Sequence, residues 1–236
     1  MKRIIFTGGN GKFGKVFRDL FSDKKNIFYP SSKNFDVTNL NKMENYIKKI
    51  KPGFIIHTAA LSRPMDIHEK KIEKSISINI IGTSNIVKLC KRFKIKLIYF
   101  STNYVYPGKK GNYSENEPVL PVNNYAISKL GGECSVQLYK NSLILRICMT
   151  EKPFIHKKAF NDVEMNFMYH KELAYNLLKL INKRGIINIG GKKQTVYKFA
   201  KQYNKKIKGI SARKKFGTKF PLRQSMNISK YKKIIK

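Results

Sequence analysis

The sequence predicts a doubly wound α/β fold around a parallel sheet, and three observations support this prediction. Short apolar runs alternate with segments of helical periodicity along the first 150 residues. The runs are apolar at nearly every position, as expected for strands that are covered on both faces. The helical segments are long enough to cross over from one strand to the next, so successive strands should lie parallel.

The elements of this part are bounded by residues that stop strands or cap helices. Pro30 stops the second strand, and Pro52-Gly53 ends the second helix, which begins at a cap formed by Thr38 or Asn39. The other boundaries lie where an apolar run gives way to helical spacing. The predicted order is strand 3–7, helix 12–21, strand 26–29, helix 39–50, strand 54–57, helix 73–93, strand 96–101, helix 125–139 and strand 142–147.

After Arg146 the pattern loosens, and the predicted elements become shorter. They are helix 171–181, strand 185–189, helix 196–203 and a final helical turn at 229–235. The tail from residue 205 is basic and contains glycines. We therefore expect residues 151–236 to form a small cap with a basic tail that packs on the sheet and is not an independent domain.

The charge of the chain is its most unusual bulk property. The 236 residues carry a formal net charge of +35, which would attract polyanions. The lysines are spread along the whole sequence, however, and a scattered excess is typical of a solvated surface, so nucleic-acid binding is not the expected function. No apolar stretch has the length of a membrane span, and no signal-peptide core follows the first residues. A cytoplasmic location is expected.

A glycine-rich segment, residues 8–14 (GGNGKFG), joins the first strand to the first helix. Glycines at 8, 11 and 14 suit a tight turn, a close approach of the backbone to a pyrophosphate and tight packing of helix on strand. The following helix N-terminus offers free N–H groups and a partial positive charge to phosphates. We therefore predict that residues 1–150 form a Rossmann-like, dinucleotide-binding domain.

Three side chains suggest acid–base chemistry at the same edge of the sheet. Tyr125 and Lys129 are spaced i to i+4, which puts them on one helix face. A nearby ammonium stabilises a phenolate, so we expect a lowered pKa of Tyr125 and a phenol that can act as an acid near neutral pH. Thr102 follows strand 96–101, at the carboxyl edge where such sheets bind ligands. The alternative is a surface Tyr and Lys in a lysine-rich chain.

The order of these motifs resembles that of a known family. Together they are similar to the extended short-chain dehydrogenase/reductases, nearest the dTDP-4-dehydrorhamnose reductase branch. The resemblance covers about the first 150 residues and continues weakly at 185–191 and 226–230. The motifs that carry it are the glycine turn, Asp36-Val37-Thr38, His57-Thr58-Ala59-Ala60, Asn79-Ile80-Ile81-Gly82-Thr83, Ser101-Thr102-Asn103-Tyr104-Val105-Tyr106 and the Tyr125/Lys129 pair.

The resemblance implies a role for each candidate residue. Tyr125 would protonate a carbonyl oxygen as hydride arrives from a nicotinamide, Lys129 would hold the nicotinamide ribose, and Thr102 would hydrogen-bond the carbonyl oxygen. Thr102, Asn103 and Tyr125 would contact the substrate. The residues implied to line the cofactor are Gly8, Asn10, Gly11, Lys12, Phe13, Gly14, Asp36, Val37, Ala59, Ala60, Leu61, Tyr125 and Lys129.

The end of the second strand bears on the choice of cofactor. Ser31, Ser32 and Lys33 present hydroxyls and a cation there, with Arg3 and Lys12 not far in sequence. This composition suits a 2′-phosphate and favours NADP(H). Asp36 could instead accept the ribose hydroxyls, which keeps NAD(H) as the alternative. The four histidines show no metal-ligand spacing, so no metal is expected.

Departures from the family pattern narrow the function. Related sugar-nucleotide dehydratases carry an acidic pair after the threonine, where this chain has Asn103-Tyr104, so dehydration is not expected. The reductase branch usually has Asp at the position of Asn103, which leaves the sugar open. The chain is also shorter than typical members, which implies a reduced cap.

The function implied is NAD(P)H-dependent reduction of a nucleotide-activated 4-keto-6-deoxysugar, as in the supply of deoxysugars for polysaccharides. One alternative is a nucleotide-sugar C4 epimerase that retains NAD. Another is a non-catalytic regulatory subunit that uses the fold to bind a nucleotide and a partner enzyme. The sequence also allows a homodimer.

Overall fold

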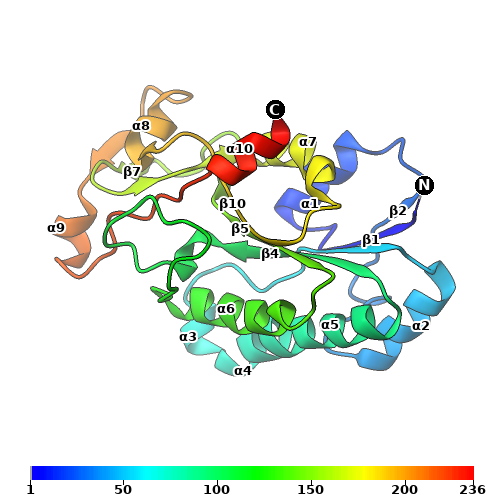
Figure 1. Cartoon of the computed structure of the whole chain (residues 1–236). Helices are drawn as coiled ribbons and strands as arrows, with labels where there is room; N and C mark the ends of the chain where they lie inside the picture. Colours follow the sequence, from blue (N-terminus) through cyan, green and yellow to red (C-terminus); the bar gives the residue numbers. More distant parts are fainter. Residues whose placement is uncertain (1) are drawn as a thin grey trace.

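The computed structural model describes residues 2–236, and its centre is a six-stranded sheet in which every neighbouring pair is parallel. The strand order is β10-β5-β4-β3-β1-β2. The sheet runs through the middle of the molecule with helices on both sides (Figure 1). Its strands are β1 (Ile4–Thr7), β2 (Ile27–Phe28), β3 (Phe54–His57), β4 (Lys96–Thr102), β5 (Ser142–Ile147) and β10 (Gly185–Ile189).

Two helical layers cover the sheet and bury alternate side chains of each strand. On one face α1 (Lys12–Leu20) packs against α7 (His170–Leu180), and α10 (Ser229–Ile235) lies over β10. On the other face lie α2 (Leu40–Ile50), α5 (Gly82–Arg92) and α6 (Asn124–Gln137), below the sheet in Figure 1. Phe6 belongs to the first core and its neighbour Ile5 to the second, as the twofold period of a strand requires. The predicted Rossmann-like, doubly wound fold is therefore confirmed.

Most predicted boundaries agree with the structure to within two residues. The cap of α2 is Asn39, whose side chain accepts a hydrogen bond from the Lys42 amide. The long helix predicted at 73–93 is present as α4 (Ile72–Ser75), a π-helical segment η1 (Ile76–Ile81) and α5. A π-helical segment widens the turn and is often found at functional sites.

The C-terminal third is more closely joined to the sheet than the sequence indicates. β10 pairs with β5 as the sixth strand, and α7 belongs to the layer of α1, so the expected division at residue 150 cuts through the central unit. The reason is that Ile187 and Ile189 are fully buried and complete the core. The sheet therefore needs residues from both expected parts.

The rest of the C-terminal third consists of short elements gathered at one end of the molecule, on the left of Figure 1. They form three two-stranded sheets, with two short helices, α8 (Val196–Lys201) and α9 (Ala212–Phe216). The strand pairs are β6 (Met149–Thr150) with β9 (Met168–Tyr169), β7 (Lys158–Phe160) with β12 (Lys208–Ile210), and β8 (Glu164–Met165) with β11 (Gln194–Thr195).

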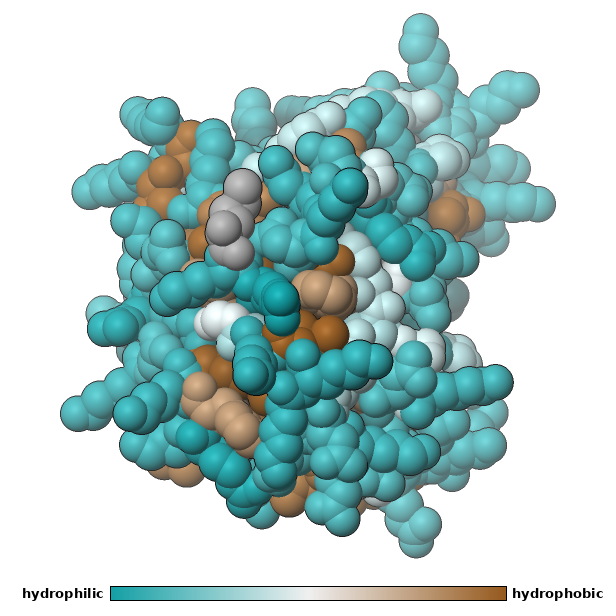
Figure 2. Space-filling model, turned by 90° about the vertical axis from the view of Figure 1, so that its right-hand side faces the viewer, coloured by the Kyte–Doolittle hydropathy of each residue, from teal (hydrophilic) through white to brown (hydrophobic). Residues whose placement is uncertain are grey.

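The surface is largely polar in the view of Figure 2, in line with a composition in which 27% of the residues are charged. The face that lies on the right of Figure 1 is mainly hydrophilic, with hydrophobic areas among the polar side chains (Figure 2). No helix within residues 2–236 combines the length and the apolar character that crossing a bilayer requires.

Candidate active site

The strand order reverses between β1 and β3, so their carboxyl ends are the place where a doubly wound sheet is expected to bind a ligand. The chain proceeds from β1 to β2 on one side, and from β3 through β4 and β5 to β10 on the other. Ligands of doubly wound sheets bind where the strand order reverses in this way. The glycine turn follows β1 there, and Thr58-Ala59 follows β3.

Two glycines of this turn cannot carry a side chain. Gly8 has a φ of +76°, and a Cβ on it would lie 2.7 Å from Thr58 Oγ1 and 2.8 Å from the Ala59 nitrogen. A Cβ on Gly14 would collide with the Gly8 carbonyl oxygen and lie 2.7 Å from Gly9 Cα. The turn after β1 therefore lies directly against the loop after β3, and α1 packs tightly on the turn.

The helix N-terminus that follows the turn is open to a ligand. Gly11 is the N-cap of α1 and has no side-chain cap, so the first N–H groups of the helix lack such a partner. Asn10, Gly11 and Lys12 are exposed. Phe13 differs, because its side chain is 5% exposed and packs against Phe100 in the core, with the two rings tilted and 5.2 Å between their centroids. Only the main chain of Phe13 is available to a cofactor.

The two cations that were expected to help bind a 2′-phosphate are engaged elsewhere. Arg3 directly precedes β1, at the opposite end of the sheet, and donates from Nη1 to the Ile50 carbonyl at 2.9 Å. Lys12 forms an ion pair with Glu151. Ser31 and Ser32 lie in the turn after β2, where Ser32 and Lys33 are exposed. These three residues remain the polar groups of this turn.

Asp36 and Val37 are held by local contacts. Asp36 Oδ1 accepts hydrogen bonds from the Thr38 amide at 2.9 Å and the Thr38 hydroxyl at 2.7 Å. Val37 is buried, and its carbonyl accepts from Asn85 Nδ2 on α5 at 3.1 Å. One oxygen of the Asp36 carboxylate is thus occupied by its own turn.

Asn79 connects the loop after β3 to the helix that carries Tyr125. Its Oδ1 accepts from the Leu61 amide at 2.8 Å, while Nδ2 donates to the Leu61 carbonyl at 2.9 Å and to Ser128 Oγ at 2.8 Å. The side chain is 1% exposed and lies in the π-helical segment η1. Residues Ala59 to Leu61 and α6 are therefore fixed relative to each other by one amide.

Thr102 and Asn103 lie at the carboxyl end of β4, and both are buried. Thr102 Oγ1 accepts from the Tyr104 amide at 3.3 Å and caps the short helix η2 (Asn103–Val105). A hydroxyl that accepts from an amide keeps its own proton for donation. Asn103 Nδ2 is buried and has no hydrogen-bond partner within the described residues. A donor left in this state is costly, and it is available to a ligand oxygen.

Tyr125 lies at the start of α6, the helix that packs against β4 and η2. Its ring is 5.2 Å from that of His68, and burial raises the pKa of its phenol to about 12, with the nearby Arg63 acting in the opposite direction. The expectation of a lowered pKa is therefore wrong for this structure. The physical reason is that desolvation of the phenol outweighs the effect of neighbouring cations.

Lys129 is buried on the next turn of α6. Its Nζ lies 4.2 Å from the centre of the Tyr99 ring on β4, and Tyr99 donates from its hydroxyl to the Lys129 carbonyl at 2.9 Å. Burial lowers the pKa of Lys129 to about 7, and the Glu133 carboxylate partly offsets this shift. Lys129 thus contacts the strand that ends in Thr102, and burial weakens its hold on its proton.

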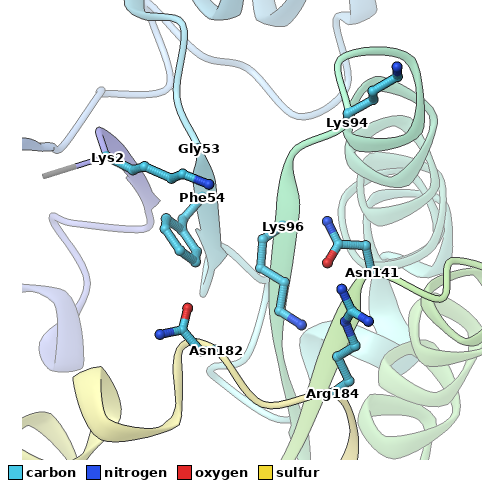
Figure 3. Close-up of a pocket in the computed structure, with 8 residues that line it drawn as sticks. All are labelled: Lys2, Gly53, Phe54, Lys94, Lys96, Asn141, Asn182 and Arg184. Carbon is cyan, nitrogen blue, oxygen red and sulfur yellow. The ribbon is translucent and has the colours of Figure 1, made fainter.

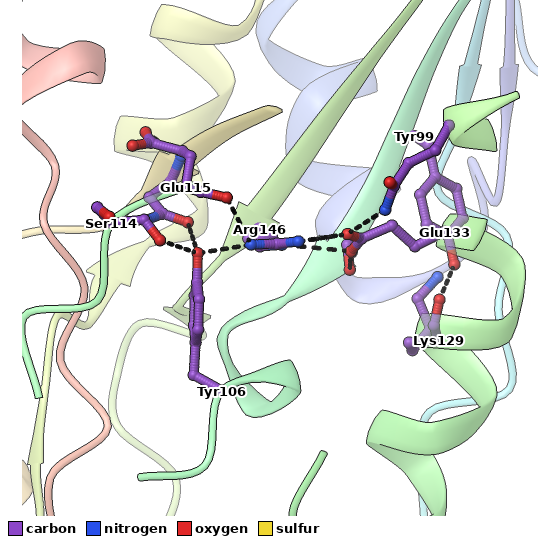
Figure 4. Close-up of polar contacts among 10 residues, drawn as sticks. Tyr99, Tyr106, Ser114, Glu115, Lys129, Glu133 and Arg146 are labelled. Carbon is purple, nitrogen blue, oxygen red and sulfur yellow. Dashed lines mark hydrogen bonds and ion pairs between the residues drawn. The ribbon is translucent and has the colours of Figure 1, made fainter. Parts of the chain in front are cut away.

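A buried polar network behind Lys129 was not predicted from the sequence. Arg146 on β5 donates from Nη2 to Glu133 Oε1 at 2.7 Å and from Nη1 to the Tyr106 hydroxyl at 2.7 Å. Ser101 Oγ donates to Glu133 Oε2 at 2.5 Å. Figure 4 shows Glu133 between Arg146 and the α6 turn that carries Lys129. The only sequence signal was the i to i+4 spacing of Lys129 and Glu133.

Arg63 and His68 were also missed. Arg63 Nη1 donates to Glu151 Oε1 at 2.8 Å, so Glu151 joins the loop after β3 to Lys12 at the glycine turn. His68 Nδ1 bonds Ser75 Oγ at 2.8 Å, and its Nε2 is buried without a partner in the described part of the chain. Arg63 lies in the loop after β3, and His68 lies in the four-residue helix α3 (Ile67–Lys70), which is too short for periodicity to give a signal.

The sequence is similar to one protein family and to several curated proteins. The sequence model of a family described as RmlD substrate binding domain matches residues 1–154. A dTDP-4-dehydrorhamnose reductase of Aggregatibacter actinomycetemcomitans is 27% identical over 193 residues, which is 80% of this chain and 60% of that protein. The methionine adenosyltransferase 2 subunit beta of Xenopus laevis is 30% identical over 155 residues, 62% of this chain and 46% of that protein. The chain thus spans 46–60% of these curated relatives.

Solved structures cover nearly the whole chain. A dTDP-4-dehydrorhamnose reductase from Bacillus anthracis, solved in complex with NADP, superposes with a TM-score of 0.87 at 25% identity, over 98% of this chain and 92% of that one. A hypothetical dTDP-4-dehydrorhamnose reductase from Sulfolobus tokodaii gives a TM-score of 0.85 at 28% identity, over 98% and 94%. The short C-terminal elements therefore belong to the shared architecture.

Proposed function

The chain belongs to the RmlD substrate binding domain family, and on that premise we propose that it uses NADPH to reduce a nucleotide-activated 4-keto-6-deoxysugar. The observation that supports this most is the buried Thr102 hydroxyl, with its proton free to donate, on the strand that Lys129 contacts through Tyr99. The short C-terminal elements between residues 149 and 226 would form the substrate-binding cap.

The glycine turn fits a dinucleotide. The left-handed Gly8 and the uncapped start of α1 form a cradle that would accept a pyrophosphate against main-chain N–H groups. Gly14 lets α1 pack closely on this turn because it has no Cβ. Gly8, Asn10, Gly11, Lys12, Gly14 and the main chain of Phe13 would hold the phosphates. Asp36 and Val37 would flank the adenine, and Ala59, Ala60 and Leu61 would lie along the centre of the cofactor.

The side chains support protonation of a carbonyl oxygen. A bound nicotinamide supplies the hydride. With a pKa of about 12, Tyr125 holds its proton at neutral pH and is ready to donate it to the oxygen on which negative charge develops. Thr102 would donate a second hydrogen bond to that oxygen. The buried Nδ2 of Asn103 offers a further donor to the substrate.

NADPH is preferred over NADH on two grounds. Ser31, Ser32 and Lys33 in the turn after β2 offer hydroxyls and a cation to a 2′-phosphate, and the Bacillus anthracis reductase is in complex with NADP. One oxygen of Asp36, the competing ribose acceptor, is engaged with Thr38. NADH remains the alternative substrate to be compared.

The decisive experiment is NADPH oxidation against a panel of nucleotide 4-keto-6-deoxysugars, run beside NADH. Tyr125→Phe should lower turnover about 100-fold, because general-acid catalysis contributes at least this much. Tyr175→Phe, at a tyrosine that is 55% exposed on α7, is the matched control and should react like the parent. Equal rates for Tyr125→Phe and the parent would contradict the proposal, and cofactor turnover without net NADPH loss would indicate an epimerase.

A nucleotide-binding subunit is the second candidate. Similarity to methionine adenosyltransferase 2 subunit beta, a protein named as a subunit, favours it. In that case the purified chain would bind NADPH, the panel would show no oxidation, and Tyr125→Phe would leave NADPH affinity unchanged. Turnover with any keto-sugar in the panel would exclude a purely non-catalytic role.

A further inference from the structure

A basic pocket lies at the end of the sheet opposite Thr102. It occupies about 260 Å³ where β1, β3, β4, β5 and β10 begin. Figure 3 shows Lys2 beside Gly53 and Phe54, and Lys96 with its ammonium near the Arg184 guanidinium. Lys94 lines the pocket but turns its ammonium away from these groups in the same view. Asn141 and Asn182 complete the lining, which includes no acidic side chain among residues 2–236.

Lys96 is the residue that sets this pocket apart from other lysine-rich surface. It is 7% exposed, and its Nζ is buried without a hydrogen-bond partner within the described residues. Burial lowers the pKa of Lys96 to about 8, and the like charge of Arg184 adds to this shift. A buried ammonium facing another cation is an unfavourable arrangement in the absence of a counter-charge.

Two structural explanations for the basic residues do not account for Lys96. Cations are favourable near helix C-termini, and the helices α5, α6 and α7 end at this side of the sheet. A lysine in that role would donate to terminal carbonyls, which Lys96 Nζ does not. Long lysine side chains also bury their stems and extend the ammonium into water, whereas here the ammonium itself is buried.

We propose that this pocket binds the phosphate group of a small anion, with Lys96 and Arg184 as its two charged contacts. At pH 7 a phosphate group carries a charge of about −1.5 to −2 and several acceptor oxygens, which two cations can satisfy together. Lys2 and the Asn182 amide lie at the same opening and supply further donors. The volume holds a phosphate and a few more atoms, since one water occupies about 30 Å³ of liquid.

The proposed site is separate from the reductase site. Lys96 begins β4, whereas Thr102 ends it, so the strand's full length lies between them. The two proposals can therefore fail independently. A pocket that binds phosphate at one end of β4 requires no turnover at the other end, and loss of keto-sugar reduction would leave phosphate binding unaffected.

The test is calorimetric titration of the full chain with inorganic phosphate and, separately, with glycerol 3-phosphate, at pH 7 and constant ionic strength set with sodium chloride. We expect saturable binding of one phosphate in the parent. Lys96→Met should weaken it about 10-fold or more, because it removes a charge-assisted hydrogen bond. Arg184→Gln, at an exposed residue that cannot disturb the core, should weaken it similarly.

Lys88→Met is the matched control, because Lys88 is exposed on α5 and does not line the pocket. It removes the same charge and should leave the dissociation constant unchanged. Stronger binding of glycerol 3-phosphate than of inorganic phosphate would identify a phosphorylated metabolite as the ligand, and the reverse order would identify the free ion. The proposal is overturned if the parent shows no saturable binding, or if Lys96→Met and Arg184→Gln both bind as Lys88→Met does.

Discussion

Lys129 shows at the scale of a single residue how burial sets the charge of a site. Its ammonium lies over the Tyr99 ring, 4.2 Å from the centroid, and a cation over an aromatic face is attracted to it. Burial nevertheless lowers its pKa from 10.5 to about 7, with Glu133 opposing the shift. The same ammonium also helps to lower the pKa of His57 to about 3, after the larger effect of burial. His57 is therefore neutral and bridges Thr7 and Thr83 by hydrogen bonds of 2.9 and 3.2 Å.

The lowered pKa of Lys129 predicts a pH dependence of stability. Between pH 7 and 10.5 the unfolded chain binds a proton at Lys129 that the folded chain releases, so the free energy of unfolding should rise with pH, by at most about 1.4 kcal/mol per unit. Lys129→Met removes this contribution. We expect the melting temperature of the parent minus that of Lys129→Met to increase from pH 7 to pH 9. Circular dichroism measures both temperatures.

Lys88→Met provides the control for this measurement, because it removes an exposed lysine. Its melting temperature should follow the parent at every pH. A parent and Lys129→Met whose difference in melting temperature stays constant from pH 6 to pH 9 would show that the ammonium does not titrate in this range.

At the scale of elements, one carboxylate joins three of them. Glu133 on α6 is fully buried, accepts from Arg146 on β5 and from Ser101 on β4, and stands one turn after Lys129. The ion pair is desolvated, with Arg146 4% and Glu133 0% exposed at the side chain. Such a pair adds little net stability when intact, but its removal on one side leaves a buried charge uncompensated. It therefore fixes α6, and with it Tyr125 and Lys129, on the sheet.

We predict that Glu133→Gln lowers the free energy of unfolding by about 3–5 kcal/mol, because Arg146 loses its counter-charge. Urea denaturation measures this change. Glu44→Gln is the control, since Glu44 pairs with the exposed Lys48 and Arg92, and such surface pairs contribute about 0–1 kcal/mol. Equal losses for the two variants would show that the buried pair is not the link between α6 and the sheet.

The elements also show what a sequence can and cannot predict. Apolar runs and glycine placement were sufficient for the six strands of the sheet, because buried parallel strands are apolar throughout. The same signal did not show that the strand at residues 185–189 completes the central sheet, since pairing partners are set by tertiary contacts. The π-helical segment at residues 76–81 was missed because it lies inside a longer helical pattern. The two- or three-residue strands of the C-terminal third were missed because so few residues show no repeated alternation.

The candidate site was predictable to a similar extent. Tyr125, Lys129 and Thr102 could be selected from spacing and from strand ends, and Gly8 and Gly14 from the turn that they make. Glu133 could not, because it lies on α6 while its partners Arg146 and Ser101 come from the strands β5 and β4. The raised pKa of Tyr125 was also beyond the sequence, since it depends on how deeply the phenol is buried.

At the scale of the whole molecule, the net charge of +35 is the dominant feature. Self-repulsion of this kind destabilises a compact state. The ten ion pairs found among the described residues include a single one in which both side chains are buried, and exposed pairs contribute little. Added salt should therefore weaken the repulsion among the excess positive charges more than it weakens the attraction within the ion pairs.

We expect the melting temperature at pH 7 to rise by about 2–4 °C, equivalent to roughly 1 kcal/mol for a chain of this size, when sodium chloride increases from 10 to 150 mM. The screening length falls from about 30 Å to about 8 Å over this range, which shields distant lysines from one another. Because chloride screens the whole surface, the melting temperature of Lys96→Met should rise with sodium chloride as much as that of the parent. Phosphate at matched ionic strength should raise the melting temperature further in the parent alone. A melting temperature that falls with sodium chloride would mean that the ion pairs outweigh the repulsion.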